Sequence, residues 1–330
     1  MNLFRTSAFW TRFFDGTLHF ISLAKLGMSR VFLFSPNGDK WNNIQQIGKE
    51  GGEHVKAEDR SRLIDRLEEL RQSKVLVYFA YTPLDDSILV PLYKHLKEIG
   101  PTEKIDLVMH SYGGAVDTPY KLVMLIREFC QRFSVIVPFV AKSAASMVVL
   151  GADEVVMGPI SELGPIDPLV KHPLYKDLWV PVQAVQHCLD YLQRSLADSP
   201  DPELVTFILS PMLNKLDPWL LGDYEKALKA SRQYAEALLS RYMLKEYPEK
   251  VPVVTRALTE AYFSHGYPIG RDEAKQLGLK VTDAEGELWE IIWELYLGYE
   301  ELFAAEDKKA LINAHAGGFV VSVGSGRALW

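Results

Sequence analysis

Ile105-Asp-Leu-Val-Met-His110 runs into Ser111-Tyr-Gly-Gly114, and Val135-Ile-Val-Pro-Phe-Val140 runs into Ala141-Lys-Ser-Ala-Ala-Ser-Met147. Each stretch is an apolar run of strand length that ends in small residues and opens a helix. Two more apolar runs of strand length lie at 75–80 and 154–157. Apolar residues with helical spacing occur at about 60–72, 87–99, 117–132 and 143–151. This alternation predicts an α/β fold with a mostly parallel sheet flanked by helices on both faces. Sites in such sheets lie at the carboxyl ends of strands, where both opening stretches end.

The second half of the chain has a helical pattern from Pro181 onward. We expect helices at roughly 181–197, 203–213, 222–246, 252–262, 271–277 and 284–304. The last of them is unusually aromatic, which is typical of a core or subunit contact. The expected organisation is an N-terminal arm and linker (1–60), an α/β core (61–180), a helical part packed on the core (181–305) and a tail (306–330).

Composition narrows the classes of function. The chain has 330 residues, a net charge of −7 and 48% apolar residues, so no nucleic-acid partner is expected. Cys130 and Cys188 lie in apolar helical patterns, which indicates reduced, structural cysteines. Neither a metal nor a cofactor is expected.

The ends of the chain bear on its location. No segment is apolar enough to span a bilayer, and the cytosol is the default location. The arm from Met1 to Phe34 is rich in Phe and Leu but is interrupted by charges. It fits a packing arm better than an amphipathic helix, which would make peripheral membrane contact.

The two strand ends offer complementary chemistry. Gly113 and Gly114 leave backbone N–H groups uncovered, and an oxyanion needs such donors. Ser143 offers a hydroxyl at the start of a helix, where a serine is most often an N-cap and less often a nucleophile. Ser146 is the rival nucleophile, one turn further into the helix. Lys142 is adjacent to Ser143, so the two side chains diverge and Lys142 is a poor base for it.

Several longer segments resemble the serine dehydrogenase proteinases, a family similar to signal peptide peptidase A and, more distantly, to the Clp protease subunit. The resemblance is strongest over 105–168, at Ser111-Tyr-Gly-Gly114, Ala141-Lys-Ser-Ala-Ala-Ser-Met147, Gly151-Ala-Asp-Glu-Val155 and Glu162-Leu-Gly-Pro-Ile-Asp-Pro168. Three segments further along the chain resemble later elements of the family, namely Leu221-Gly-Asp-Tyr224, His265-Gly-Tyr-Pro-Ile269 and Ala274-Lys-Gln-Leu-Gly-Leu279. The resemblance implies a ClpP/crotonase-like core in an oligomeric protein.

The resemblance also implies roles for individual residues. Aligning the family's Ala-Ala-Asp-Glu-Ile segment on Gly151–Val155 without a gap makes Ser143 the nucleophile, whereas the Ala-Ala-Ser-Met string of the Clp subunit points to Ser146. The oxyanion would be held by the amides of Gly113, Gly114 and Ala144. The chain departs from the family at Tyr112, where relatives have Pro, and in reading Ser-Ala-Ala where they have Ser-Gly-Gly.

The general base stays open at this point. Signal peptide peptidase relatives use a lysine, and Lys176 is the candidate by that analogy. Asp167 falls about where the Clp histidine would, yet it fits a turn residue before Pro168 equally well. His265 lies far along the chain and fits a satisfied structural histidine.

Three hypotheses about function follow. The leading one is a serine hydrolase, most plausibly a peptidase acting on peptides or proteins as a homo-oligomer. The second is a catalytically inactive crotonase-like assembly or binding protein, favoured by the unassigned base. The third is an acyl-CoA-utilising crotonase-like enzyme, which would use the amide hole for an enolate.

Overall fold

The fold is described from a computed structural model that covers residues 57–171, 179–196, 218–306, 310–314 and 319–321, and residues 203, 207, 210 and 211. The chain divides into two compact units, Met1–Glu53 and His54–Trp330. All described residues belong to the second unit. The N-terminal arm, Lys176 and most of the helix expected at 203–213 lie outside the described residues.

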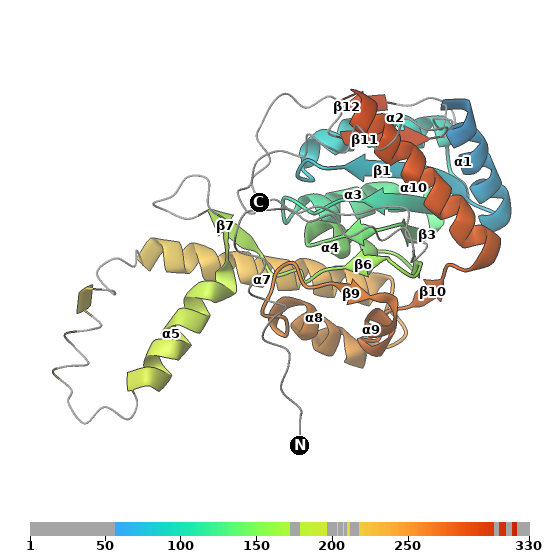
Figure 1. Ribbon diagram of the computed structural model, residues 1–330. Helices are drawn as coiled ribbons and strands as arrows, with labels where there is room; N and C mark the ends of the chain where they lie inside the picture. The colour runs from blue at the N-terminus through green and yellow to red at the C-terminus, as the bar shows by residue number, and fades with distance from the viewer. Residues whose placement is uncertain are drawn as a thin grey trace, which may run out of the picture. The chain divides into compact units, whose positions relative to one another are not determined.

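The central sheet has seven strands in the order β10-β5-β3-β2-β1-β11-β12 (Figure 1). Its parallel strands are β1 (Lys74–Ala80), β2 (Thr102–His110), β3 (Cys130–Val137), β5 (Glu154–Met157) and β10 (Val281–Asp283). Two antiparallel strands extend the sheet beyond β1, namely β11 (Ala310–Ala314) and β12 (Phe319–Val321). The predicted mostly parallel sheet is therefore confirmed.

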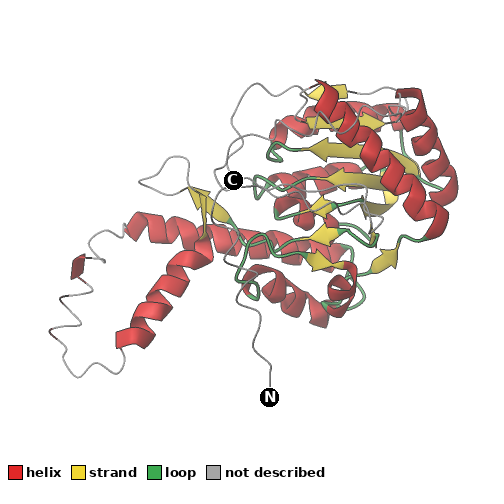
Figure 2. Cartoon of the chain, viewed as in Figure 1, coloured by secondary structure: helices red, strands yellow, loops and turns green. Residues whose placement is uncertain are grey.

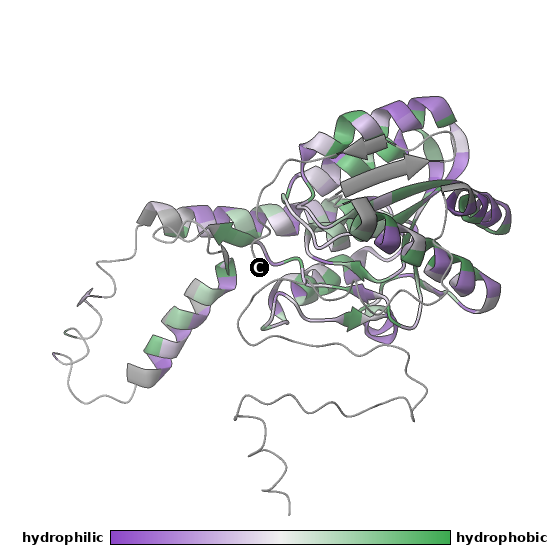
Figure 3. Ribbon diagram, turned by 45° about the horizontal axis from the view of Figure 1, so that its top comes forward, coloured by the Kyte–Doolittle hydropathy of each residue, from purple (hydrophilic) through white to green (hydrophobic). Residues whose placement is uncertain are grey.

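Helices cover both faces of this sheet (Figure 2). Strand β1 shows how the faces are separated, because Leu76 and Tyr78 join one apolar cluster while Val77 and Phe79 join the other. One face packs against α1 (Ala57–Arg71) and α10 (Gly286–Glu306). The other packs against α2 (Leu89–Ile99), α3 (Thr118–Arg127), α4 (Ala144–Leu150), α7 (Pro218–Arg241), α8 (Val251–Glu260) and α9 (Arg271–Gln276). In Figure 3 the strands are mostly hydrophobic, and the helices carry hydrophilic residues as well.

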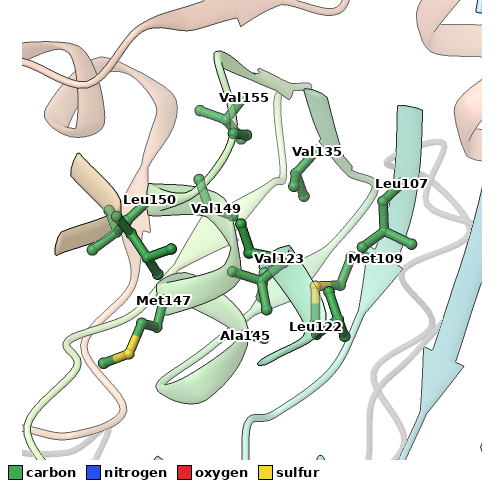
Figure 4. Packing of buried hydrophobic residues seen from close by; sticks show 14 of the residues in the cluster. Leu107, Met109, Leu122, Val123, Val135, Ala145, Met147, Val149, Leu150 and Val155 are labelled. Carbon is green, nitrogen blue, oxygen red and sulfur yellow. The ribbon is translucent and has the colours of Figure 1, made fainter. Parts of the chain in front are cut away.

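Helix α4 is held firmly in this core. All seven of its residues are buried. Figure 4 shows Ala145 and Val149 of this helix among Met109 of β2, Val123 of α3 and Val135 of β3. A position at the start of α4 is consequently fixed relative to the strand ends, because close-packed interiors leave little room for displacement.

Smaller sheets complete the described part. A three-stranded sheet has the order β4-β6-β9, with β4 (Val140–Ala141), β6 (Glu162–Leu163) and β9 (Ile269–Gly270). A two-stranded sheet joins β7 (Leu169–Lys171) to β8 (Trp179–Pro181), which leads into α5 (Val182–Leu196). Two short 3₁₀ helices occupy Asp86–Ile88 and Pro248–Lys250.

Three expectations need correction. The run 135–140 is not one strand, because the chain leaves the central sheet after Val137 and enters the three-stranded sheet at Val140. Cys130 begins β3 instead of lying in a helix, since α3 ends at Arg127. The C-terminal segment, expected as a tail, supplies β11 and β12.

Within the described residues, none of the helices combines the length and the apolar character needed to cross a bilayer.

Candidate active site

The two strand ends predicted to be neighbours are joined by backbone hydrogen bonds. The amide of Ser111 donates to the carbonyl of Val140 at 3.0 Å, and the amide of Lys142 donates to the carbonyl of Ser111 at 3.0 Å. These bonds form a parallel bridge between Ser111 and Ala141. The glycine turn and the start of α4 therefore lie side by side, as the sequence predicted.

Gly113 lies directly against Ser143. Its φ is +99°, and a Cβ atom there would lie 2.8 Å from the Cβ of Ser143 and 3.0 Å from the amide nitrogen of Ala144. Any side chain at this position would be strained and would block that amide. The amide of Gly113 itself donates to the hydroxyl of Ser111 at 3.2 Å.

Gly114 allows an equally close approach on the other side. A Cβ atom there would lie 2.1 Å from the carbonyl oxygen of Leu84. Leu84 donates to the carbonyl of Gly113 at 2.7 Å and accepts from the amide of Ala115 at 2.8 Å. In such a parallel bridge the amide of Gly114 points away from Leu84. Within the described residues the amides of Gly114 and Ala144 have no hydrogen-bond acceptor.

Ser143 has an unusual backbone. Its φ of 50° and ψ of −118° put it in a region that costs a non-glycine residue about 1–3 kcal/mol. Gln72, the other described non-glycine residue with positive φ, directly follows α1, where helices often end in this way. Ser143 begins α4 without a side-chain capping hydrogen bond. Ser143 thus occupies the N-cap position predicted for it, but its side chain does not cap the helix, and the strained turn leaves a half-buried hydroxyl beside the glycines.

Ser146 is engaged in structure. It is 1% exposed, and its hydroxyl donates to the carbonyl of Ala141 at 2.6 Å and accepts from the amide of Gly164 at 2.9 Å. These bonds tie α4 to β4 and to the residue after β6. The hydroxyl that remains available at this end of α4 is that of Ser143.

Lys142 is also fully engaged. Its Nζ lies 2.7 Å from a carboxylate oxygen of Glu162, and it donates to the carbonyls of Leu163 at 3.1 Å and Tyr267 at 3.2 Å. The predicted divergence from Ser143 is confirmed. Lys142 instead ties β6 to the loop before β9.

Asp167 contacts a histidine that the sequence left unassigned. Oδ1 of Asp167 lies 2.9 Å from Nδ1 of His265, with the Asp167 side chain 3% exposed and the His265 side chain 21% exposed. An ionised carboxylate can only accept, so Nδ1 carries a proton, and in a neutral imidazole of this tautomer the lone pair lies on Nε2.

The three-stranded sheet places this pair at the same end as Ser143. Ala141, Leu163 and Ile269 form one row across β4, β6 and β9, with β6 parallel to β4 and β9 antiparallel to β6. Ser143 lies two positions after Ala141, and Asp167 lies four positions after Leu163. His265 lies four positions before Ile269, whose strand runs in the opposite direction. All three thus leave the row in one direction. The bond from Lys142 to Tyr267 confirms that the loop carrying His265 reaches the neighbour of Ser143.

The contact between Asp167 and His265 could not be predicted from the sequence because the two residues are 98 positions apart. The available signal was the segment His265-Gly-Tyr-Pro-Ile269, which resembles an element of the family. Lys176, the lysine candidate, lies outside the described residues.

Comparisons with known proteins show which proteins this chain is similar to. Residues 52–178 match the family model described as ClpP-like SDH-type serine proteinase. Two uncharacterized proteins of Methanocaldococcus jannaschii, MJ0137 and MJ1495, are similar in sequence. The first is 27% identical over 72% of this chain and 78% of its own length, and the second 25% over 77% and 75%.

Solved structures with some similarity are also proteases. A mutant of the 1510-N membrane-bound stomatin-specific protease, in complex with a substrate peptide, is 12% identical, with a TM-score of 0.39 over 62% of this chain and 72% of that one. The ClpP protease catalytic domain from Plasmodium falciparum is 11% identical, with a TM-score of 0.37 over 72% and 96%. The part of this chain that holds the glycine turn, Ser143 and Asp167 thus matches, as its sequence suggested, the ClpP-like SDH-type serine proteinases.

Proposed function

We propose that this protein is a serine peptidase in which Ser143 is the nucleophile, His265 the general base and Asp167 the residue that orients His265. The observation that carries the proposal is the part-buried Asp167–His265 hydrogen bond at the end of the strand row from which Ser143 also extends. The strained, uncapped backbone of Ser143 supports it independently.

The reaction would proceed by acyl transfer. Nε2 of His265 takes the proton of the Ser143 hydroxyl as Oγ forms a bond to the substrate carbonyl carbon. The negative charge that develops on the carbonyl oxygen is held by backbone amides. The protonated imidazole then gives its proton to the leaving amine as the peptide bond breaks. Water, deprotonated by His265, releases the acyl group from Ser143 by the same steps.

The oxyanion donors of this proposal are the amides of Gly114 and Ala144. Both are without an acceptor in the described part of the chain. The amide of Gly113 was also a candidate, but the hydroxyl of Ser111 already accepts from it. Gly113 instead provides the space that brings Ser143 and the Ala144 amide to the turn.

The test uses the purified full-length chain. A fluorophosphonate probe should label Ser143, as located by peptide mass spectrometry, and hydrolysis of a fluorogenic peptide mixture should be lost in Ser143→Ala. Ser240→Ala, which removes an exposed hydroxyl of α7, is the matched control and should keep full activity. Unchanged hydrolysis by Ser143→Ala would exclude this nucleophile.

The base is tested separately. His265→Gln should lower kcat at least a hundredfold, and Asp167→Asn should also lower it, because Asn stabilises the wrong imidazole tautomer. Lys176→Met should retain activity. If Lys176→Met is inactive and His265→Gln is active, a Ser–Lys mechanism replaces the one proposed. The homo-oligomer and the membrane contact of the arm stay predictions, for which light scattering and vesicle co-sedimentation are the measurements.

A further inference from the structure

A carboxylate surrounded by tyrosines lies next to the glycine turn. The hydroxyls of Tyr81 and Tyr296 both donate to one oxygen of Glu300, the second at 2.6 Å. The ring of Tyr112 stacks on that of Tyr81 with centroids 6.3 Å apart. We call Tyr81, Tyr112, Tyr296 and Glu300 the tyrosine–glutamate cluster. It joins the end of β1, the turn and α10, and all but Tyr296 are half-exposed.

In the described part of the chain, the carboxylate of Glu300 takes part in hydrogen bonds but in no ion pair. Among the described residues no Lys, Arg or His forms an ion pair with Glu300, whereas Glu162 is paired with Lys142. Arg60, also on the α10 side, donates to the carbonyl of Gly298 and lies over the ring of Tyr299.

The imidazole of His110, whose ring lies near two tyrosines of the cluster, does not compensate the charge of Glu300 either. His110 is 1% exposed, its ring lies 5.3 Å from that of Tyr296 and 5.4 Å from that of Tyr81, and neither ring nitrogen has a partner in the described part. Burial lowers the pKa of His110 to about 3, so it stays neutral.

The neighbouring tyrosine reports the resulting field. Burial and the charges of Glu300 and Glu162 raise the pKa of Tyr112. A negative potential that holds a proton on a phenol also attracts a cation. Aromatic faces with a carboxylate are the surroundings that an ammonium or guanidinium group prefers.

One member of the cluster, Tyr112, lies in the turn that contacts Ser143. Tyr112 directly precedes Gly113, whose Cβ position would lie 2.8 Å from the Cβ of Ser143. An extended peptide advances about 3.3–3.6 Å per residue. A long side chain at or next to the cleaved bond therefore has the reach to contact the cluster.

We propose that the tyrosine–glutamate cluster binds the cationic side chain of lysine or arginine, so that the preferred substrates are peptides with a basic residue at or next to the cleaved bond. The inference rests on the proposed peptidase function, because it places the cluster beside Ser143. Tyr81 and Tyr296 fix the carboxylate of Glu300, and the ring of Tyr112 covers the aliphatic stem of the bound side chain.

Binding and hydrolysis are measured separately so that the two proposals fail in different ways. Calorimetry with full-length Ser143→Ala compares a peptide that contains lysine with the same peptide in which norleucine replaces lysine. The lysine peptide should bind at least tenfold more tightly. Adding Glu300→Gln should abolish this difference, whereas Glu294→Gln, an exposed residue of the same helix, should preserve it. Lysine-selective binding without hydrolysis by the wild-type chain would refute only the peptidase proposal.

The active chain supplies the second measurement. The ratio of kcat/KM for the lysine peptide to that for the norleucine peptide should fall at least tenfold in Glu300→Gln, with the norleucine value little changed. Tyr112→Leu should lower the same ratio and serves if Glu300→Gln does not fold. Equal binding of the two peptides, binding of neither, or a lysine preference that survives both variants would overturn the proposal.

Discussion

Two serines three positions apart, Ser143 just before α4 and Ser146 within it, have different surroundings. Ser143 has a strained backbone and a hydroxyl that caps nothing, whereas the hydroxyl of Ser146 makes two hydrogen bonds in the interior. The residue that the rest of the fold leaves unused is the one suited to chemistry.

Ser146→Ala should therefore destabilise the protein. The change leaves the amide of Gly164 buried without its acceptor, and such a loss costs about 1–3 kcal/mol. Urea unfolding followed by circular dichroism measures it. Ser240→Ala should shift the free energy of unfolding by less than about 0.5 kcal/mol. Equal stability of the Ser146 variant and the wild type would contradict a stabilising role for the two hydrogen bonds of Ser146.

Gly113→Ala should damage both folding and activity. The added methyl group would meet the carbonyl of Lys142 at 2.7 Å and the amide of Ala144 at 3.0 Å, at a φ of +99°. We expect a loss of about 1–3 kcal/mol of stability and at least a hundredfold of kcat/KM.

Gly222→Ala is the control for Gly113→Ala. This glycine lies within α7 with open space around its Cβ position, so alanine should stabilise the protein by about 0.5–1 kcal/mol. A Gly113 variant that gains stability in the same way would show that the turn tolerates a side chain.

At the scale of elements, a buried charge network ties α1 to the central sheet. Nε of Arg71 donates to Asp106 of β2 at 2.8 Å, and Nη2 donates to Glu154 of β5 at 2.6 Å. The Asp106 side chain is fully buried. Burial would raise the pKa of Glu154. Hydrogen bonds from Thr282 and Arg71, with the positive charges of Arg71 and Lys104, instead lower this pKa to about 2.

Arg71→Met should cost about 1.5–3 kcal/mol, because it removes charged hydrogen bonds to the buried Asp106 and leaves Lys104, whose Nζ lies 3.7 Å from Asp106, as the nearest counter-charge. Thermal and urea unfolding give the value. Arg66→Met on the same helix breaks exposed pairs with Glu69 and Glu287 and should cost less than about 1 kcal/mol. Similar losses for the two variants would mean that the buried network contributes no more than surface pairs do.

The predictability of these elements from sequence depended on their length and on how local their causes are. The strands β1, β2 and β5 contain the apolar runs 75–80, 105–110 and 154–157, from which they were predicted. Strands β6 and β9 have two residues each, too few for any period, and are defined by their pairing, β6 with β4 and β9 with β6. The break at Pro138-Phe139 was invisible because both sides of it are apolar. The contact between His265 and Asp167 could not be predicted for a similar reason, since it depends on the row across three short strands.

At the scale of the whole molecule, the C-terminal strands close one edge of the sheet. Strand β11 pairs with β1 over Leu76–Ala80, and all five of these residues of β1 are buried. Without β11, this edge of β1 would be open, and an open strand edge pairs readily with another chain.

Removal of residues 310–330 should consequently expose β1 and cause self-association. We expect a lower midpoint of thermal unfolding and larger species in size-exclusion chromatography with light scattering. Removal of residues 322–330 alone retains β11 and β12 and should leave both measurements unchanged. A well-behaved 310–330 deletion, with the midpoint of the full chain, would argue against a structural role for these strands.

The row formed by Ala141, Leu163 and Ile269 also has a consequence for the making of the protein. A ribosome that has passed Ser143 has yet to synthesise His265, more than a hundred codons later. Until that segment emerges and β9 joins β6, a nucleophile that depends on His265 stays idle. Proteolytic activity would then arise only after the segment that carries His265 has been made, which would spare the nascent polypeptide and its neighbours on the polysome from premature cleavage.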